Sequence, residues 1–244
     1  GHFQKVFEIY DGLDNFDVEV ISRSKGEKFT SHRTALTTAF YIQNTDKFFE
    51  IYKKLENHFE SEFGSIAHMN LNTYRAMNSF MRGNYIEANE YALAAVALAD
   101  ELKVNGAYSS FESAYILADT YLEFGEVDKS LAIAQKYLAR AFEFEQFPWI
   151  TAFHAKVSAC LLQEGNISGA LSAIRKGRES IASPIFGDLL ALPLDIHEVM
   201  IRIQLEDLHR IDEIISLVPD SQIGESFKMA LQIRKSPSSK IGRA

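Results

Sequence analysis

The sequence repeats a short turn motif at nearly constant spacing, and this repetition constrains the fold more than any other feature. Three segments align without gaps; they begin at Gly83, Gly125 and Gly165, so their spacings are 42 and 40 residues. Each glycine lies between two apolar patterns typical of helices, so we expect it to end the first helix in the left-handed conformation. The polar residue after each glycine is suited to cap the next helix. A chain built in this way is predicted to form an array of helical hairpins.

Small residues recur at fixed positions around these turns. One stands seven positions before each glycine and another stands five positions after it, so the two are always 12 residues apart. Small side chains let two helices approach closely, so these positions are expected where paired helices meet. Weaker copies of the motif begin at Asn44 and His209, which makes about five units of roughly 40 residues. The small residues are Ala76, Ala118 and Ser158 before the turns, and Ala88, Ser130 and Ala170 after them.

The complete pattern also has a bulky residue two positions after each glycine, namely Tyr85, Val127 or Ile167. This combination resembles the tetratricopeptide repeat, whose usual length is about 34 residues. The units in this chain are 39 to 44 residues long, and longer repeats of this kind resemble the sensor region of MalT-like, LuxR-type transcriptional regulators. The resemblance covers residues 30–218. It implies an all-α fold, a right-handed superhelix of about five antiparallel helical hairpins known as a TPR-like α-solenoid.

Apolar periodicity predicts paired helices along most of the chain. We expect the repeat array at 29–218, a capping helix at 219–235 and a flexible tail at 236–244. Residues 1–28 form an N-terminal segment that begins like a tag remnant and is a candidate partial repeat. Helix is favoured there, although part of the segment alternates like a strand. Pro193 predicts a late start or a kink in its helix. The expected helices are 29–43, 45–62, 65–82, 85–103, 107–124, 127–145, 149–164, 167–182, 187–206 and 210–217.

The charge and the cysteine content of the sequence restrict the cellular compartment and the kinds of partner that we expect. The chain has 25 basic and 33 acidic residues, a formal net charge of −8, which argues against a surface dedicated to nucleic acid. The single cysteine, Cys160, cannot form an internal disulfide and suits a reducing compartment. The sequence contains no apolar run of 18 residues and no signal-peptide pattern. We therefore expect a cytoplasmic chain that contacts neither membrane nor nucleic acid.

Motifs for catalysis and metal binding fail on particular residues. There is no glycine-rich phosphate loop. The segment that begins with His197-Glu198 resembles the start of a zinc-protease motif, but Ile201 stands where the second histidine is required. Cys160 is expected to be an inert buried thiol. Asn166 begins a glycosylation sequon, but its place in a hairpin turn explains it better. The sequence therefore predicts no catalytic residue, no metal site and no cofactor.

A candidate binding face remains. The first helices of the hairpins line the inner face of such an array, and the inward positions can be counted from the small residue of each repeat. They form a mixed face of amides, acids, aromatic and basic groups that can hydrogen-bond and stack. The predicted ligand- or partner-binding residues are Asn70, Thr73, Met77, Glu112, Tyr115, Asp119 and Lys156, with Ala152 and Ala159 on the same face.

An aromatic run between two hairpins has two possible explanations. Phe142, Phe144, Phe147 and Trp149 lie in or beside the predicted turn between the third and fourth units. Packing between repeats is the favoured explanation, and a docking patch is the alternative. The acidic residues within the run would suit a basic partner.

Two functional hypotheses follow, and both are non-enzymatic. If the MalT-like resemblance holds, the chain is the sensor segment of a bacterial transcriptional regulator, which binds a small-molecule inducer or a regulatory protein and relays this to oligomerisation. The alternative is a free-standing adaptor that captures a peptide or helix of a partner protein. An enzyme is disfavoured because Glu112 and Asp119, the best acid pair, are two helical turns apart, about 10 Å.

Overall fold

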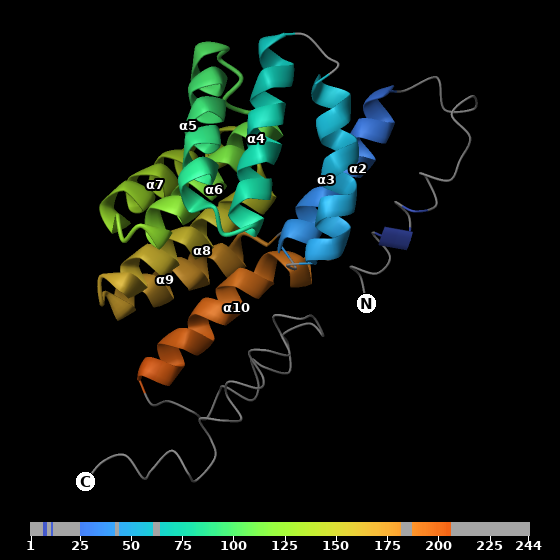
Figure 1. Cartoon of the computed structure of the whole chain (residues 1–244). Helices are drawn as coiled ribbons and strands as arrows, with labels where there is room; N and C mark the ends of the chain where they lie inside the picture. Colours follow the sequence, from blue (N-terminus) through green and yellow to red (C-terminus); the bar gives the residue numbers. More distant parts are fainter. Residues whose placement is uncertain are drawn as a thin grey trace. The chain divides into compact units, whose positions relative to one another are not determined.

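The computed structural model describes residues 7–8, 11, 25–41, 44–60, 64–181 and 187–205, and all regular structure in these ranges is helical (Figure 1). None of the described helices is both long and apolar enough to cross a bilayer. The described part contains nine labelled helices: α2 (Lys25–Tyr41), α3 (Thr45–Glu60), α4 (Ser65–Met81), α5 (Tyr85–Glu101), α6 (Tyr108–Glu123), α7 (Val127–Glu143), α8 (Phe147–Gln163), α9 (Ile167–Glu179) and α10 (Gly187–Gln204).

The chain divides into two compact units, residues 1–51 with 212–244 and residues 52–211. In the first unit, the rings of Phe40 on α2 and Phe48 on α3 pack together, with their centroids 6.2 Å apart. In the second unit, α4 pairs with α5, α6 with α7, and α8 with α9. The first helices also pack in sequence, α4 on α6, α6 on α8 and α8 on α10. The all-α array of antiparallel hairpins predicted from the repeats is confirmed.

The predicted glycine turns are present in the structure. Gly83, Gly125 and Gly165 have φ angles of 74°, 71° and 76°, in the left-handed region. In each turn the residue after the glycine donates its backbone N–H to a carbonyl five positions earlier, as Asn84 does to Ser79 over 2.8 Å. This bond closes the end of the helix before the next helix begins. The next helix therefore returns antiparallel to the first.

The turn predicted at Asn44 is one residue out of register. The backbone N–H of Asn44 donates to the Ala39 carbonyl over 2.9 Å, which is the bond made by the residue after each glycine. Its side-chain Oδ1 accepts a hydrogen bond from the Lys47 backbone over 3.1 Å, as Asn166 accepts from Gly169. Asn44 is therefore an N-cap and corresponds to Asn84, not to Gly83. The prediction failed because asparagine can occupy either position.

The six small residues lie where the helices of each hairpin meet. Ala76, Ala118 and Ser158 are fully buried, and so are Ala88, Ser130 and Ala170. In the third hairpin the Ser130 hydroxyl donates to the Ala118 carbonyl over 2.7 Å, across the pair. This bond satisfies a hydroxyl that the close packing has removed from water.

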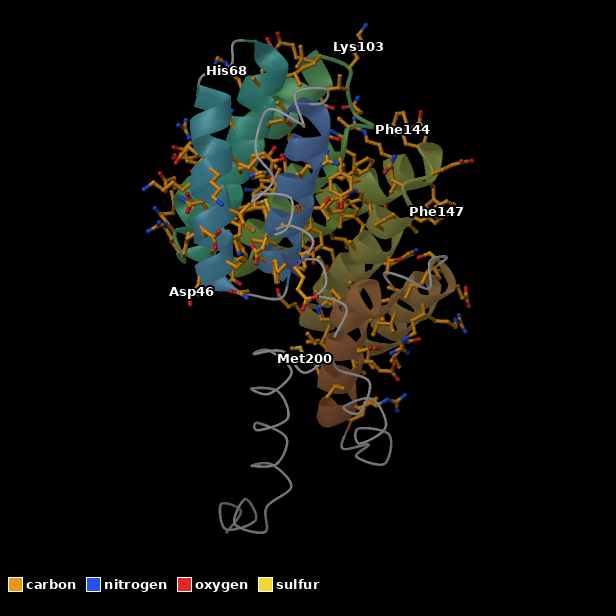
Figure 2. All side chains as sticks on the ribbon, turned by 90° about the vertical axis from the view of Figure 1, so that its right-hand side faces the viewer. Asp46, His68, Lys103, Phe144, Phe147 and Met200 are labelled. Carbon is orange, nitrogen blue, oxygen red and sulfur yellow. The ribbon has the colours of Figure 1, made fainter. Side chains whose placement is uncertain are left out.

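An aromatic core joins the third hairpin to the fourth. Trp149 stacks on Phe111 with ring centroids 5.9 Å apart, and Phe153 lies 5.9 Å from Tyr137. All four rings are buried. The neighbouring side chains of Phe144 and Phe147 are 42% and 49% exposed (Figure 2). Met200 on α10 is similarly exposed, at 43%. Packing therefore accounts for Trp149 and leaves much of the aromatic run uncovered.

Several expectations concern residues beyond the described ranges. They include the weak turn at 209–214, the capping helix at 219–235 and the tail at 236–244. Of residues 1–28, those described are helical, and α2 begins at Lys25, four residues before the expected start. Pro193 lies inside α10, which runs from Gly187, so that helix does not start late.

The turn geometry gives a first prediction. A Cβ at Gly125 would meet no atom within 4 Å, so the cost of a side chain there is conformational and not steric. We expect Gly125→Ala to lower the free energy of unfolding by about 1 kcal/mol, because an L-residue is strained in the left-handed region. Gly125→Asn should cost less, since asparagine tolerates that region. Urea unfolding followed by circular dichroism measures both, and equal stability of all three proteins would contradict the turn geometry.

Candidate binding site

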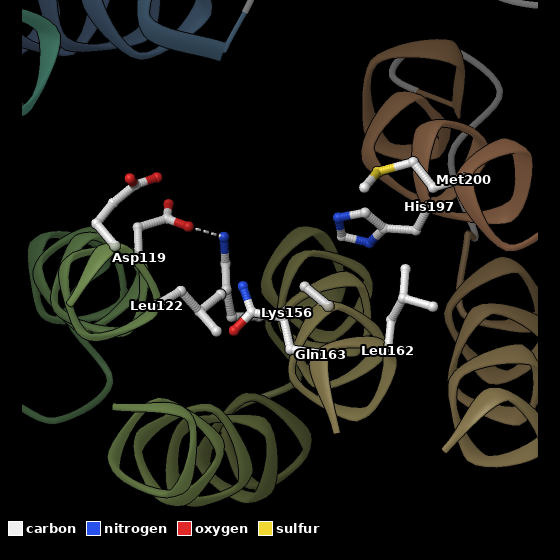
Figure 3. A pocket seen from close by; sticks show the side chains of 9 residues that line it. Asp119, Leu122, Lys156, Leu162, Gln163, His197 and Met200 are labelled. Carbon is white, nitrogen blue, oxygen red and sulfur yellow. Dashed lines mark hydrogen bonds and ion pairs between the residues drawn. The ribbon is translucent and has the colours of Figure 1, made fainter. Parts of the chain in front are cut away.

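The described part of the second unit contains a pocket between α6, α8 and α10. Its volume is about 380 Å³, enough for one or two side chains of a ligand. The α6 side and the α8 side contribute an acid and a base, and the α10 side contributes a histidine and a methionine (Figure 3). The lining residues are Asp119, Leu122, Glu123, Lys156, Ala159, Leu162, Gln163, His197 and Met200.

A buried ion pair forms one wall of the pocket. Lys156 on α8 donates to the carboxylate of Asp119 on α6, and the two side chains are only 7% and 20% exposed. The ammonium also lies 4.1 Å from the centre of the Tyr115 ring, a cation–π contact. Burial opposes the charge of Lys156, but Asp119 and Tyr115 outweigh it and raise the pKa of this lysine. Lys156 is therefore a fixed positive charge, largely neutralised by Asp119.

His197 forms the opposite wall as a neutral group. Burial lowers its pKa to about 4, and the positive charge of Lys156 adds to this effect. A backbone hydrogen bond with Ala155 favours the charged form but does not outweigh these effects, so the imidazole is uncharged at neutral pH. Its Nδ1 atom is buried and has no hydrogen-bond partner among the described residues. Met200, one turn further along α10, is 43% exposed and offers an apolar surface.

Charged side chains hold α10 in place for this site. Arg178 on α9 donates to Asp195 over 2.6 Å and also to Glu198, both on α10. Arg202 binds the same Glu198 carboxylate, with Nη2 at 2.5 Å. Both acids are mostly buried, with side chains 7–8% exposed. This network fixes the helix that carries His197 and Met200, and so does the apolar cluster that Leu194 and Ile201 form with residues of α8 and α9.

The structure brings three of the seven predicted binding residues together and separates the other four from the pocket. Asp119 and Lys156 form the ion-paired wall just described, and Tyr115 contacts Lys156 without lining the pocket itself. Asn70 accepts a hydrogen bond from Ser109 over 2.6 Å, and Thr73 lies 2.7 Å from the Ser113 hydroxyl, both between α4 and α6. Met77 and Glu112 are buried, each 2% exposed. As ligand-binding residues, all seven stay predictions.

Sequence reasoning missed most of the pocket lining. Leu122 and Glu123 follow Asp119 by one helical turn, and Gln163 follows Lys156 by two, so the predicted face could have been extended along both helices. His197 and Met200 could not be counted in this way, because the fifth hairpin has no small marker residue at the expected place. Their contribution depends on how α10 packs on α8.

Two further features of the described residues bear on metal binding and on nucleophilic catalysis. No group of three or more His, Cys, Asp or Glu side chains in these ranges could hold a metal ion. Cys160 is buried, which raises the pKa of its thiol, and its sulfur lies 3.3 Å from the Ser130 hydroxyl. A buried thiol with a raised pKa is a poor nucleophile.

Comparison with known proteins defines the class of fold. No protein-family model matches the sequence, and no match is found among curated proteins. Among solved structures, BtubC (BKLC) from P. vanneervenii is similar with a TM-score of 0.58 at 8% identity, covering 94% of this chain and 89% of that chain. A Rap protein complexed with Competence and Sporulation Factor has a TM-score of 0.63 at 14% identity, covering 94% of this chain and 67% of that chain. The chain has the fold of a tetratricopeptide-like helical-repeat protein.

Proposed function

We propose that this chain is a binding module that holds a segment of a peptide or partner protein in the pocket between α6, α8 and α10. The pocket itself is the observation that carries the proposal. It combines apolar surface from Leu122, Leu162 and Met200 with a fixed ion pair and a neutral imidazole. Such a mixture suits a peptide, whose side chains need apolar contact and whose backbone needs hydrogen-bond donors and acceptors.

The arrangement of helices supports the same reading. The pocket is lined by first helices of successive hairpins, the face that helical-repeat proteins use for extended ligands. His197 Nδ1 needs a partner, because an unpaired buried polar atom costs about 1–3 kcal/mol. The Rap protein of similar fold was solved as a complex, which agrees with a binding role but at 14% identity supports only the fold.

The proposal treats the chain as a non-enzymatic module. Lys156 is neutralised by Asp119 and is charged at neutral pH, so it is a poor nucleophile or base. His197 has a pKa of about 4, well below the operating range of a general base at pH 7. These two groups are suited to recognition.

Thermal-shift screening of the full chain tests the proposal, with short peptides, sugars and nucleotides as probes. A peptide that binds the native state must raise the melting temperature. We expect Met200→Lys to weaken the affinity for such a peptide by at least about tenfold, because a charge replaces an apolar wall of the pocket. Isothermal titration calorimetry measures this change.

Leu93→Lys is the matched control. Leu93 on α5 is 43% exposed, as Met200 is, but it does not line the pocket. It should leave the affinity unchanged. If both variants keep the wild-type affinity, the site lies elsewhere; if a sugar or nucleotide is the only ligand found, the chain binds a small-molecule inducer instead.

A narrower hypothesis makes this module the sensor segment of a MalT-like transcriptional regulator. The repeat length of 40 to 42 residues, counted between equivalent turn residues in the described ranges, is the observation that favours it over a generic adaptor. The similar structures support the repeat fold and do not bear on this point. Flanking nucleotide-binding and DNA-binding domains in the encoding gene would support the regulator, and their absence would support the free-standing adaptor.

A further inference from the structure

The turn between α7 and α8 carries more exposed aromatic surface than the fold uses. Phe142, Phe144 and Phe147 are 56%, 42% and 49% exposed. Elsewhere in the described ranges, no other group of three large apolar residues lies exposed within six positions of the sequence. Figure 2 shows Phe144 and Phe147 projecting on the same side of the molecule. We call these three phenylalanines with the acids between them, Glu143 and Glu145, the aromatic turn.

Two of the three rings are held in place by their neighbours. Phe144 lies over Gly106, where an added Cβ would come within 2.8 Å of the ring, so the backbone of the preceding inter-repeat loop supports it. Phe142 meets the ring of His154 edge-on, with centroids 6.2 Å apart. Each of these rings still exposes two fifths or more of its surface. The aromatic turn is therefore preorganised, which lowers the entropy lost on binding.

The acids of the aromatic turn are exposed and lie outside every ion pair seen in the described part of the chain. Glu143 ends α7, and Glu145 follows in the loop. Glu145 has a φ of 52°, in the left-handed region that the turns inside the hairpins fill with glycine. An L-residue there costs about 1–2 kcal/mol. The turn thus keeps a carboxylate at a position where glycine would be unstrained.

We propose that the aromatic turn is a docking surface for a basic segment of a partner protein, one with arginine or lysine side chains next to apolar ones. Guanidinium and ammonium groups are attracted to aromatic faces, and the two neighbouring carboxylates add a charge of −2 on the surface. An acidic segment would be repelled. A second copy of this chain is disfavoured as the occupant, because each copy has a net charge of −8.

This surface is separate from the pocket. Phe147 begins α8, and Lys156, the first pocket residue on that helix, lies nine residues later, about 14 Å along the helix. One partner could therefore occupy the aromatic turn while a peptide occupies the pocket. The two proposals can fail independently, since none of the residues of the aromatic turn lines the pocket.

Fluorescence anisotropy with two labelled synthetic peptides tests the proposal on the full chain. One peptide places arginine and leucine at alternate helical turns, and the other has glutamate in place of each arginine. The arginine peptide should bind, with an affinity that falls as salt rises. Glu143→Gln with Glu145→Gln should weaken binding by at least about fivefold, and Phe147→Ser should do the same. Glu90→Gln with Asp128→Asn, which removes two exposed acids elsewhere, should change nothing.

Three results would overturn the proposal. The first is equal affinity for the two peptides, and the second is unchanged affinity after the double glutamine substitution. The third is self-association of the chain, detected by light scattering, that Phe147→Ser abolishes, because the occupant would then be a second copy. Circular dichroism melts of each variant verify that it is folded, which the exposure of these side chains leads us to expect.

Discussion

Asp119→Ala should lower the free energy of unfolding by about 3 kcal/mol, a large effect for a partly exposed side chain. The variant removes the carboxylate that pairs with Lys156, whose side chain is only 7% exposed in the native protein. Removing one partner of a buried ion pair is strongly destabilising, because the remaining charge is neither solvated nor paired. The Tyr115 ring beside the ammonium can compensate only a small part of this cost. Urea unfolding followed by circular dichroism measures the change.

Replacing both partners should be far milder. In Asp119→Leu with Lys156→Met no charge is buried, so we expect the double variant to recover most of the stability lost in the single one. Glu90→Ala, which removes an exposed acid from α5, should change stability by less than about 0.5 kcal/mol. If Asp119→Ala lowered the free energy of unfolding by less than about 1 kcal/mol, water would reach Lys156 freely. The interpretation of Lys156 and Asp119 as a fixed, buried ion pair would then be wrong.

Trp149→Ala should be at least as costly, at about 4 kcal/mol. Trp149 is 2% exposed and touches the rings of Tyr108, Phe111, Tyr115 and Phe153, with centroids between 5.1 and 6.2 Å away. Its removal leaves a large cavity in the core that joins α6 to α8. Because these two helices hold Asp119 and Lys156, the variant should also weaken ligand binding at the pocket. Chemical unfolding and calorimetry measure the two effects.

Trp149→Phe provides the comparison. The indole Nε1 of Trp149 is buried and has no hydrogen-bond partner among the described residues. Phenylalanine therefore removes an unsatisfied donor as well as some volume, and the two effects oppose each other. We expect a loss of about 1 kcal/mol. If Trp149→Ala cost no more than Trp149→Phe, the aromatic core would not be what joins the two hairpins.

Some of the left-handed turn residues were predictable from the sequence and others were not. Gly83, Gly125 and Gly165 were predictable, since glycine takes a positive φ at no steric cost. The left-handed residues in the turns between hairpins, Lys103 and Glu145, were not predictable. Their φ angles of 58° and 52° depend on how neighbouring hairpins pack, for which the residue types themselves contain no signal.

The candidate binding site was also predictable only in part. Counting helical turns from the small marker residues placed Tyr115, Asp119 and Lys156 on one face, and in the structure these three side chains meet. The same count also selected Thr73 and Met77, which are buried between helices. A helical period identifies a face of a helix but does not say whether the neighbouring helix covers it.

The sequence by itself determined the class of fold, because the glycine turns and the small residues at fixed spacing act locally and recur in three successive hairpins. Only the tertiary structure decided which residues complete the candidate site. His197 and Met200 complete the pocket because Arg178 binds Asp195 and Glu198 and so holds α10 beside α8. The charge of Lys156 is stable because Asp119 reaches it from another hairpin, 37 residues away. Such contacts depend on distances in space, which local periodicity does not contain.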